Sequence, residues 1–278
     1  MDAHEKEQLL ALAKEAARAG GAELLARFRR LPMTAISQKG HADYVSEADM
    51  AAETAIIQVL SRAGDEFGFL GEETGRRCGT RPEMWVVDPL DGTSNFIWGI
   101  PYFSVSIALC DDDGEILGVV FDAVHDEMFS AIRAQGAWLE DRAIDTLKAK
   151  SPDQAVLSIS LPVPGQLRCL SQDRFLTGLQ VAMQSVAGLR RLGSAALDLA
   201  YVGAGRLDGY FEDGLSYYDI AAGKLIAKEA GALVTDASGR AARQGSVVAA
   251  HPDIHAWLGD TFTLDIMKHA PPNSKSDC

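Results

Sequence analysis

The chain has 278 residues, of which 47% are hydrophobic and 23% are charged. This length and composition suit one large domain or two closely packed ones with a substantial core, and they exclude a chain that is disordered throughout. The formal net charge of -13 argues against a sequence-independent nucleic-acid surface, because phosphate backbones require clustered Lys and Arg. No apolar stretch approaches the length of a membrane-spanning helix, and the four cysteines lack both C-x-x-C spacing and the density of a disulfide scaffold. We therefore expect a cytoplasmic protein with neither a membrane nor a nucleic-acid partner.

The first half of the chain reads as two helices followed by strands. Apolar residues between Leu9 and Phe28 recur at near-helical spacing and predict an amphipathic amino-terminal helix rather than a secretory signal. A second helix is expected near residues 47–62. Strands are expected near residues 67–71, 84–88, 103–110, 115–121 and 127–132.

The second half alternates between strands and helices. Strands are expected near residues 154–160, 187–192, 208–212, 232–235 and 246–249, and helices near residues 172–184, 195–204 and 218–230. This alternation predicts layered α/β packing, and Gly231 is suited to end the last of these helices. We divide the chain into an α+β half at residues 1–150, an α/β half at residues 151–269 and a disordered polar tail at residues 270–278.

Acidic residues lie at the ends of several apolar runs, where a buried core does not need them. They are Glu72, Glu73, Asp88, Asp91 and Asp219. Magnesium prefers oxygen ligands and retains several waters, so clustered carboxylates at strand ends suit it. The sequence therefore indicates a site for two or more magnesium ions, with a phosphate as the reacting group.

Residues 84–96 carry the central motif, an apolar strand that turns through Pro89 into Asp91. Pro89 fixes its own φ, which would aim the carbonyl of Leu90 at the point that the carboxylates reach. If a short helix starts at Thr93, its free amide groups would offer donors to an anion there. The alternative is an ordinary turn in which Asp91 caps that helix. The other acidic residues also have ordinary explanations, as solvated strand ends or complements to a helix dipole. Only the occurrence of all three acidic segments in one chain favours a metal site.

Three motifs stand at these acidic positions. They are Gly71-Glu72-Glu73, Asp88-Pro89-Leu90-Asp91-Gly92-Thr93 and Tyr218-Asp219-Ile220-Ala221-Ala222-Gly223. Together they resemble the inositol monophosphatase family of magnesium-dependent, lithium-sensitive phosphatases, over nearly the whole chain. The resemblance implies a layered αβαβα sandwich of the sugar-phosphatase type, a homodimer, and two or three Mg2+ ions as cofactors.

The resemblance also implies a role for each matching residue. The implied metal ligands are Glu72, Asp88, the carbonyl of Leu90, Asp91 and Asp219. Asp49 and Thr93 would orient the attacking water, with Glu72 as a further catalytic group. Without the family, Ser46 and Asp49 form an ordinary capping arrangement for the helix that follows.

A phosphorylated polyol or sugar is expected to lie beside the metal ions. The residues implied to bind it are Asp91, Gly92, Thr93, Ser94, Ala195, Glu212 and Asp219. Backbone groups near Ser194 and Ala195, together with the carboxylate of Glu212, would hydrogen-bond the hydroxyls of a polyol. Without the resemblance, Glu212 is an exposed residue at a strand end, and the small residues allow close helix packing.

Three departures from the family pattern bear on the choice of substrate. Tyr218 replaces the usual Trp, Trp98 stands where His is frequent, and Asp141 occupies a turn position that is often Asn. None of them removes a ligand. His251 and His255 have metal-like spacing, but a helix start between them favours capping or a surface position.

We therefore expect magnesium-dependent hydrolysis of a small phosphomonoester by a metal-activated water, with inositol monophosphate or a related polyol or sugar phosphate as the substrate. A haloacid-dehalogenase-type phosphatase, which uses an aspartyl nucleophile, is one alternative. Its Asp-x-Asp-Gly-Thr motif has one residue between the two aspartates, whereas two residues separate Asp88 from Asp91. A binding or regulatory protein with dispensable phosphatase activity is another.

Overall fold

The structure is a computed structural model that describes residues 1–30, 36–40, 43–144, 150–162 and 166–263. Its helices are α1 (Ala3–Arg27), α2 (Glu47–Leu60), α3 (Thr93–Ile97), α4 (Gln172–Ser185), α5 (Ala195–Gly203), α6 (Tyr217–Glu229) and α7 (Pro252–Thr263), with short 3-10 turns η2 (Ser61–Ala63) and η3 (Pro152–Gln154). Its strands are β1 (Ile36–Gly40), β2 (Asp43–Ser46), β3 (Gly68–Gly71), β4 (Gly75–Arg77), β5 (Met84–Asp91), β6 (Ser104–Asp111), β7 (Gly114–Asp122), β8 (Glu127–Ile132), β9 (Gly136–Leu139), β10 (Arg142–Ala143), β11 (Val156–Ile159), β12 (Gly188–Arg190), β13 (Gly209–Leu215), β14 (Leu233–Thr235) and β15 (Gly245–Ala250).

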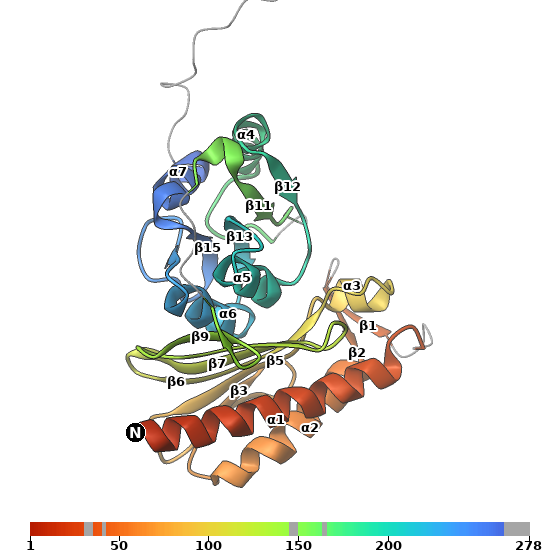
Figure 1. The fold of residues 1–278 in the computed structure, drawn as a ribbon. Helices are drawn as coiled ribbons and strands as arrows, with labels where there is room; N and C mark the ends of the chain where they lie inside the picture. Colours follow the sequence, from red (N-terminus) through yellow and green to blue (C-terminus); the bar gives the residue numbers. More distant parts are fainter. Residues whose placement is uncertain (31–35, 41–42, 145–149, 163–165, 264–278) are drawn as a thin grey trace, which may run out of the picture.

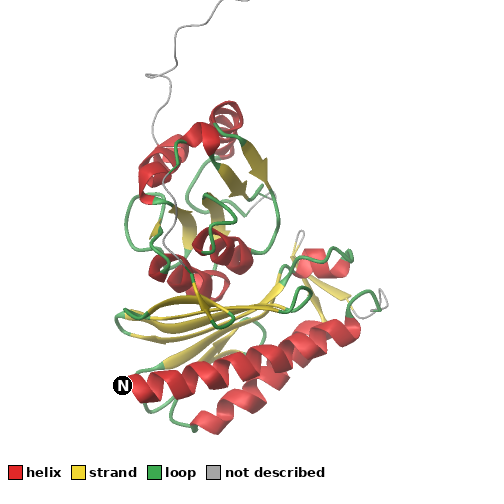
Figure 2. Cartoon of the chain, viewed as in Figure 1, coloured by secondary structure: helices red, strands yellow, loops and turns green. Residues whose placement is uncertain are grey.

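Helices and sheets alternate through the molecule in five layers (Figure 1). Helices α1 and α2 cover one face of an eight-stranded sheet of order β10-β9-β8-β7-β6-β5-β3-β4. Helices α5 and α6 lie on its other face and also support a five-stranded sheet of order β12-β11-β13-β15-β14. The far face of this second sheet carries α4 and α7, so helices form both outer layers (Figure 2). The arrangement confirms the expected layered αβαβα sandwich.

Four apolar clusters join the five layers. The cluster beneath the eight-stranded sheet includes Leu24, Ile56 and Phe103, all fully buried. Alanine-rich faces of α5 and α6 form the next two clusters, which lets these helices lie close to both sheets. In the fourth, the ring of Phe211 on β13 stacks on that of Phe262 on α7, with their centroids 3.9 Å apart. The central helices α5 and α6 therefore pack against both sheets and join them in one core.

Most of the predicted elements are confirmed to within a few residues. The strand expected at residues 84–88 continues to Asp91, and α6 ends just before Gly231, whose φ is 99°. Five short strands were not expected, namely β1, β2, β4, β9 and β10. The tail predicted at residues 270–278 lies outside the described residues. The division of the chain at residue 150 stays a prediction, because α5 and α6 join both halves.

Two further observations concern sequence-based exclusions. Of the helices in the described ranges, not one combines the length and apolarity needed to cross a bilayer. Cys78, Cys110 and Cys169 are free thiols, and Cys278 lies outside the described residues. The five layers thus form around apolar clusters without a disulfide among those three cysteines.

Candidate active site

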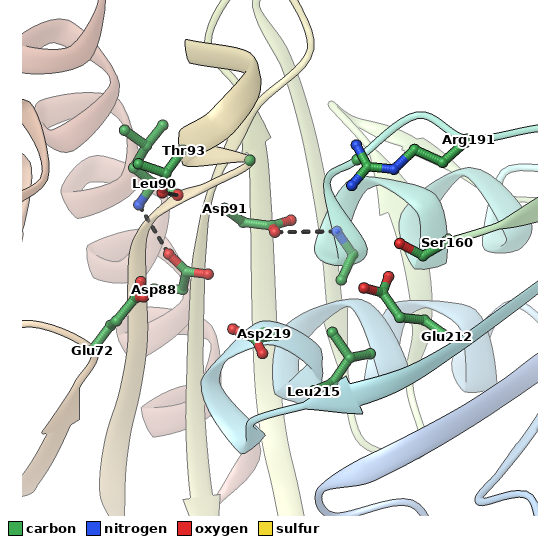
Figure 3. Close-up of a pocket in the computed structure, with 13 residues that line it drawn as sticks. Glu72, Asp88, Leu90, Asp91, Thr93, Ser160, Arg191, Glu212, Leu215 and Asp219 are labelled. Carbon is green, nitrogen blue, oxygen red and sulfur yellow. Dashed lines mark hydrogen bonds between the residues drawn. The ribbon is translucent and has the colours of Figure 1, made fainter. Parts of the chain in front are cut away.

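Strand β5 carries two predicted ligands and is irregular where they lie. Its pairing with β6 shifts register between Asp88 and Asp91. Pro89 has no amide hydrogen for the ladder, so it is suited to this bulge. The amide of Leu90 instead donates to Asp88 Oδ1 over 3.0 Å. The bulge therefore brings Asp88, Leu90 and Asp91 to one end of the sheet (Figure 3).

Asp91 is fixed by the amino terminus of α5. Its Oδ2 accepts from Ser194 Oγ at 2.5 Å and from the Ala196 amide at 2.7 Å, while its Oδ1 accepts from the Ala195 amide at 3.1 Å. Burial raises the pKa of Asp91 to about 6, although these hydrogen bonds lower it. The Ala195 amide thus serves Asp91, whereas we expected it to face a substrate hydroxyl. Binding of substrate by Ala195 stays a prediction.

Thr93 joins three segments at the start of α3. Its Oγ1 lies 3.0 Å from the carbonyl oxygen of Leu90 and 3.4 Å from Oδ1 of Asp49, a buried residue of α2. Gly92 precedes it with φ of 98°, and a Cβ there would approach the backbone oxygens of neighbouring segments at 3.1 and 3.2 Å. Only glycine fits this turn without strain. The structure thus brings Asp49 and Thr93 together, as the sequence implied.

Glu72 follows β3 and lies beside the end of β5. Its amide donates to the carbonyl of Val87 over 3.2 Å, which continues the parallel pairing of the two strands. The turn after it is held by Glu53 of α2, which is fully buried. The carboxylate of Glu53 accepts from the amides of Glu73 at 2.9 Å and Thr74 at 3.0 Å, and from the Thr74 hydroxyl. Sequence analysis missed this contact, because its partners lie about twenty residues away.

Asp219 comes from the other half of the chain, in the first turn of α6. It forms a capping box with Ser216, whose amide donates to Asp219 Oδ2 over 2.6 Å. The side chain of Asp219 therefore stabilises the start of the helix, as an acidic residue in a first turn ordinarily does. It also lines the same cavity as the β5 residues. Figure 3 shows it at the start of α6, facing Asp88 and Asp91.

All of these segments surround one cavity of about 180 Å³. The residues that line it are Glu72, Asp88, Leu90, Asp91, Gly92, Thr93, Ser160, Arg191, Gly193, Ala195, Glu212, Leu215 and Asp219. Every predicted metal ligand is in this set. Asp49 is not, and it reaches the site through Thr93. Ser94 and Glu73 also lie outside the lining, so a role for Ser94 in substrate binding stays a prediction.

Glu72, Asp88, Asp91 and Asp219 form the acidic wall of the cavity, and this wall fits a cation. Burial, followed by the negative charges of Glu72, Asp91 and Asp219, holds the pKa of Asp88 well above its usual range. Burial likewise raises the pKa of Asp219. In the described part of the chain, no group of three or more acidic, His or Cys side chains is spaced, as it stands, to hold a metal ion. Carboxylates spread around a cavity of this kind suit Mg2+, which keeps several of its waters and takes few protein ligands.

Comparison with known proteins identifies the fold and the family. The model of the inositol monophosphatase family matches residues 5–263. The chain belongs to the inositol monophosphatase family. It is 42% identical over 250 residues to the inositol-1-monophosphatase of Rhizobium meliloti (strain 1021), which covers 88% of this chain and 92% of that protein. It is 39% identical over 274 residues to the Nus factor SuhB of Pseudomonas aeruginosa, covering 96% of this chain and 98% of that protein.

Solved structures agree with this membership. The extragenic suppressor protein suhB from Bartonella henselae has a TM-score of 0.86 and 38% identity, covering 93% of this chain and 100% of that one. The Thermotoga maritima IMPase has a TM-score of 0.81 and 30% identity, covering 91% of this chain and 96% of that one. An inositol monophosphatase fold over residues 5–263 leaves no place for the haloacid-dehalogenase alternative, which we therefore set aside.

Beyond Asp91, the cavity is lined by residues of the second sheet and its loops. Ser160 follows β11, Glu212 lies on β13, and Arg191 precedes α5. Burial raises the pKa of Glu212 to about 7, even though hydrogen bonds from Tyr210 and Ser160 lower it. Sequence analysis assigned Glu212 through the resemblance but gave no role to Ser160 or Arg191. The signal for Ser160 was its position at the end of a predicted strand.

None of the three departures from the inositol monophosphatase pattern lies in the lining of this cavity. Trp98 caps α3 and is 60% exposed, and Tyr218 packs between α6 and the eight-stranded sheet. Asp141 lies in the turn from β9 to β10. The ring of His251 accepts from the Asp253 amide at 3.1 Å, which confirms the capping role expected at the start of α7.

A buried network holds α5 between the two sheets. Asp198, one turn into α5, accepts from the Tyr102 hydroxyl at 2.7 Å and from Ser158 Oγ of β11 at 2.8 Å. Nearby, the side-chain amide of Asn95 donates to the carbonyls of Tyr102 at 2.7 Å and Leu192 at 2.8 Å. Both contacts fix the helix terminus that binds Asp91.

Asp198→Asn is expected to make stability less dependent on pH. Burial raises the pKa of Asp198 to about 8 in the folded state, against about 4 in the unfolded chain. The folded carboxyl therefore keeps its proton across this range, and its contribution to stability, complete below pH 4, is lost as the pH rises to 8. The variant should match the wild type at pH 4 and exceed it by about 1–3 kcal/mol at pH 8.

Urea denaturation in EDTA at several pH values measures this difference. The exposed residue Asp112 offers a matched control, because Asp112→Asn should leave the pH profile unchanged. A constant difference between Asp198→Asn and wild type from pH 4 to pH 8 would contradict the assignment.

Proposed function

We propose that this protein is a magnesium-dependent phosphomonoester hydrolase whose substrate is inositol monophosphate or a related polyol or sugar phosphate. Membership of the inositol monophosphatase family supports a phosphatase. The observation that carries the proposal is the meeting of Glu72, Asp88, Asp91 and Asp219, from three separate segments, on one cavity. Carboxylates gathered in this way repel one another, and a bound cation would relieve that repulsion. Hydrogen bonds to helix termini account for the positions of Asp91 and Asp219 only in part.

The residues at and beside the acidic wall would have two roles in hydrolysis, metal binding and orientation of the attacking water. Glu72, Asp88, Asp91, Asp219 and the carbonyl of Leu90 would hold two or three Mg2+ ions. When bound, Mg2+ supplies Lewis-acid activation of a water and neutralises the charge that develops on the leaving oxygen. The hydroxyl of Thr93, held between Leu90 and Asp49, would orient the attacking water together with Asp49, and Glu72 would be a further catalytic group. The protein itself forms no covalent bond to phosphorus in this scheme.

The other wall would bind the alcohol part of the substrate. Glu212 and Ser160 offer hydrogen-bonding groups to the hydroxyls of a polyol, and Gly92, Thr93 and Ala195 also line the cavity. A cavity of about 180 Å³ suits a small ring or short chain rather than a polymer. These features favour a compact polyol phosphate.

Phosphate release from a panel of monoesters tests the proposal. The panel comprises inositol 1-phosphate, fructose 1,6-bisphosphate, phosphoadenosine phosphate and histidinol phosphate, each with and without Mg2+. We expect Mg2+-dependent turnover, with the highest kcat/KM among the polyol and sugar phosphates. No release from any of them would contradict the proposed activity.

A second role as a regulatory protein is supported by the names of several relatives. Proteins called Nus factor SuhB in five bacteria are 37–40% identical to this chain. If such a role exists here, it should survive loss of the phosphatase activity, so a catalytically dead variant that complements a deletion strain would establish it. The homodimer expected from the resemblance also stays a prediction, which light scattering would test.

A further inference from the structure

Arg191 is the one basic side chain among the thirteen described residues that line the cavity. It follows β12 directly and leads into α5. Gly193 leaves room for it, because a Cβ at that position would lie 2.5 Å from Arg191 Nη1. Arginine stays protonated at any physiological pH, so a permanent positive charge stands at the rim of an otherwise acidic site.

The guanidinium of Arg191 is available to bind a ligand. No hydrogen bond or ion pair joins it to another residue in the described ranges, although its charge offsets part of the rise that burial causes in the pKa of Glu212. Glu212 itself is engaged by the Tyr210 hydroxyl. By contrast, the neighbouring Arg190 lies outside the lining and donates to the carbonyl of Leu189 over 2.9 Å.

The position of Arg191 relative to the acidic wall decides what it can bind. Figure 3 shows its guanidinium on the same side of Asp91 as Ser160 and Glu212, away from Glu72 and Asp88. If the reacting phosphate lies with the metal ions at the acidic wall, Arg191 faces the alcohol that leaves. It is therefore placed to recognise the alcohol part and not the phosphorus that is attacked.

We propose that Arg191 forms a subsite for a second oxyanion, so that the enzyme prefers polyol or sugar phosphates whose alcohol part also carries a phosphate or a carboxylate. This inference rests on the proposed function and refines its substrate class. The planar guanidinium can donate two parallel hydrogen bonds to either group, which is a stronger contact than it can make with a neutral hydroxyl. Without Arg191, the surrounding carboxylates would repel such a substrate.

Steady-state kinetics of Arg191→Met test the subsite with three Mg2+-loaded substrates. Inositol 1-phosphate has a neutral alcohol, fructose 1,6-bisphosphate adds a phosphate, and 3-phosphoglycerate adds a carboxylate. We expect kcat/KM to fall about 10- to 100-fold for an anionic substrate, mainly through KM, and to change less than about 3-fold for inositol 1-phosphate. The two anionic substrates show which oxyanion the subsite accepts.

Two further variants separate a specific contact from a general effect. Arg191→Lys keeps the charge but not the paired donors, so it should recover part of the loss. Arg190→Met should behave as wild type on all three substrates. An equal loss on all three substrates, or no loss on either anionic one, would overturn the subsite while leaving the phosphatase intact. If the wild type hydrolyses none of them, the proposed function fails, and the subsite fails with it.

Discussion

Asp88→Asn is expected to lower kcat at least about 1,000-fold, which corresponds to ~4 kcal/mol of transition-state stabilisation. Asp88 lies at the centre of the acidic wall, where burial and three neighbouring carboxylates act on it. Asparagine has nearly the same shape, and its side-chain oxygen can still accept from the Leu90 amide as Asp88 does over 3.0 Å. The variant should therefore fold normally but lack the charge that holds a cation.

Thermal unfolding with and without Mg2+ accompanies the kinetic measurement. In EDTA the Asp88→Asn variant should be at least as stable as wild type, because one of several like charges is gone. Mg2+ at 100 times its Kd should add about 2.7 kcal/mol to the free energy of unfolding of the wild type and so raise its Tm. The Tm of the variant should rise much less.

Glu73→Gln provides the matched control for this prediction. Glu73 adjoins Glu72 in the sequence, but it lies outside the cavity. We expect its replacement to change kcat less than about 3-fold, whereas Glu72→Gln should resemble Asp88→Asn. A fully active Asp88→Asn variant would sink the assignment of this carboxylate as a metal ligand.

Glu53→Ala should cause the largest loss of stability, about 3–5 kcal/mol in urea denaturation. Glu53 is fully buried, and its carboxylate satisfies two backbone amides and one hydroxyl in the turn that follows Glu72. Removing it leaves those donors without acceptors in a site where water has little access. Because the same turn positions Glu72, the Mg2+ concentration for half-maximal activity should also rise.

Glu53→Gln separates the two effects. Glutamine keeps one acceptor oxygen, so it should lose less stability than alanine and retain part of the Mg2+ affinity. The helix around the position is not in question, since Ala is a better helix former than either residue. Wild-type stability in Glu53→Ala would contradict the role of this contact in holding the turn.

The metal ligands could be predicted from the sequence because local chemistry marks them. Glu72 follows β3 directly, Asp88 closes the apolar run of β5, Asp91 ends that strand, and Asp219 stands in the first turn of α6. Such positions are visible as breaks in hydrophobic patterns, and the sheet then brings the ends of β3 and β5 together. The turn through Pro89 indicated the carbonyl of Leu90 as well, which periodicity alone does not reveal, and the family motifs agreed.

The parts that could not be predicted depend on contacts between distant segments. The strand at residues 84–88 was expected to end at Asp88, yet its pairing with β6 resumes at Asp91 after a bulge. Glu53 looked like an ordinary helical residue, because its partners follow β3. Arg191 looked like part of a strand, and it reaches the cavity because the amino terminus of α5, which it precedes, is bonded to Asp91 of β5. No local pattern encodes such pairings.

The most direct test of the central claim is a crystal structure with Mn2+, which shares the oxygen ligands of Mg2+ and has an anomalous signal. The account predicts two or three anomalous peaks in the cavity, bounded by Glu72, Asp88, Asp91, Asp219 and the carbonyl of Leu90. The absence of any peak there, at an Mn2+ concentration that supports full activity, would contradict it.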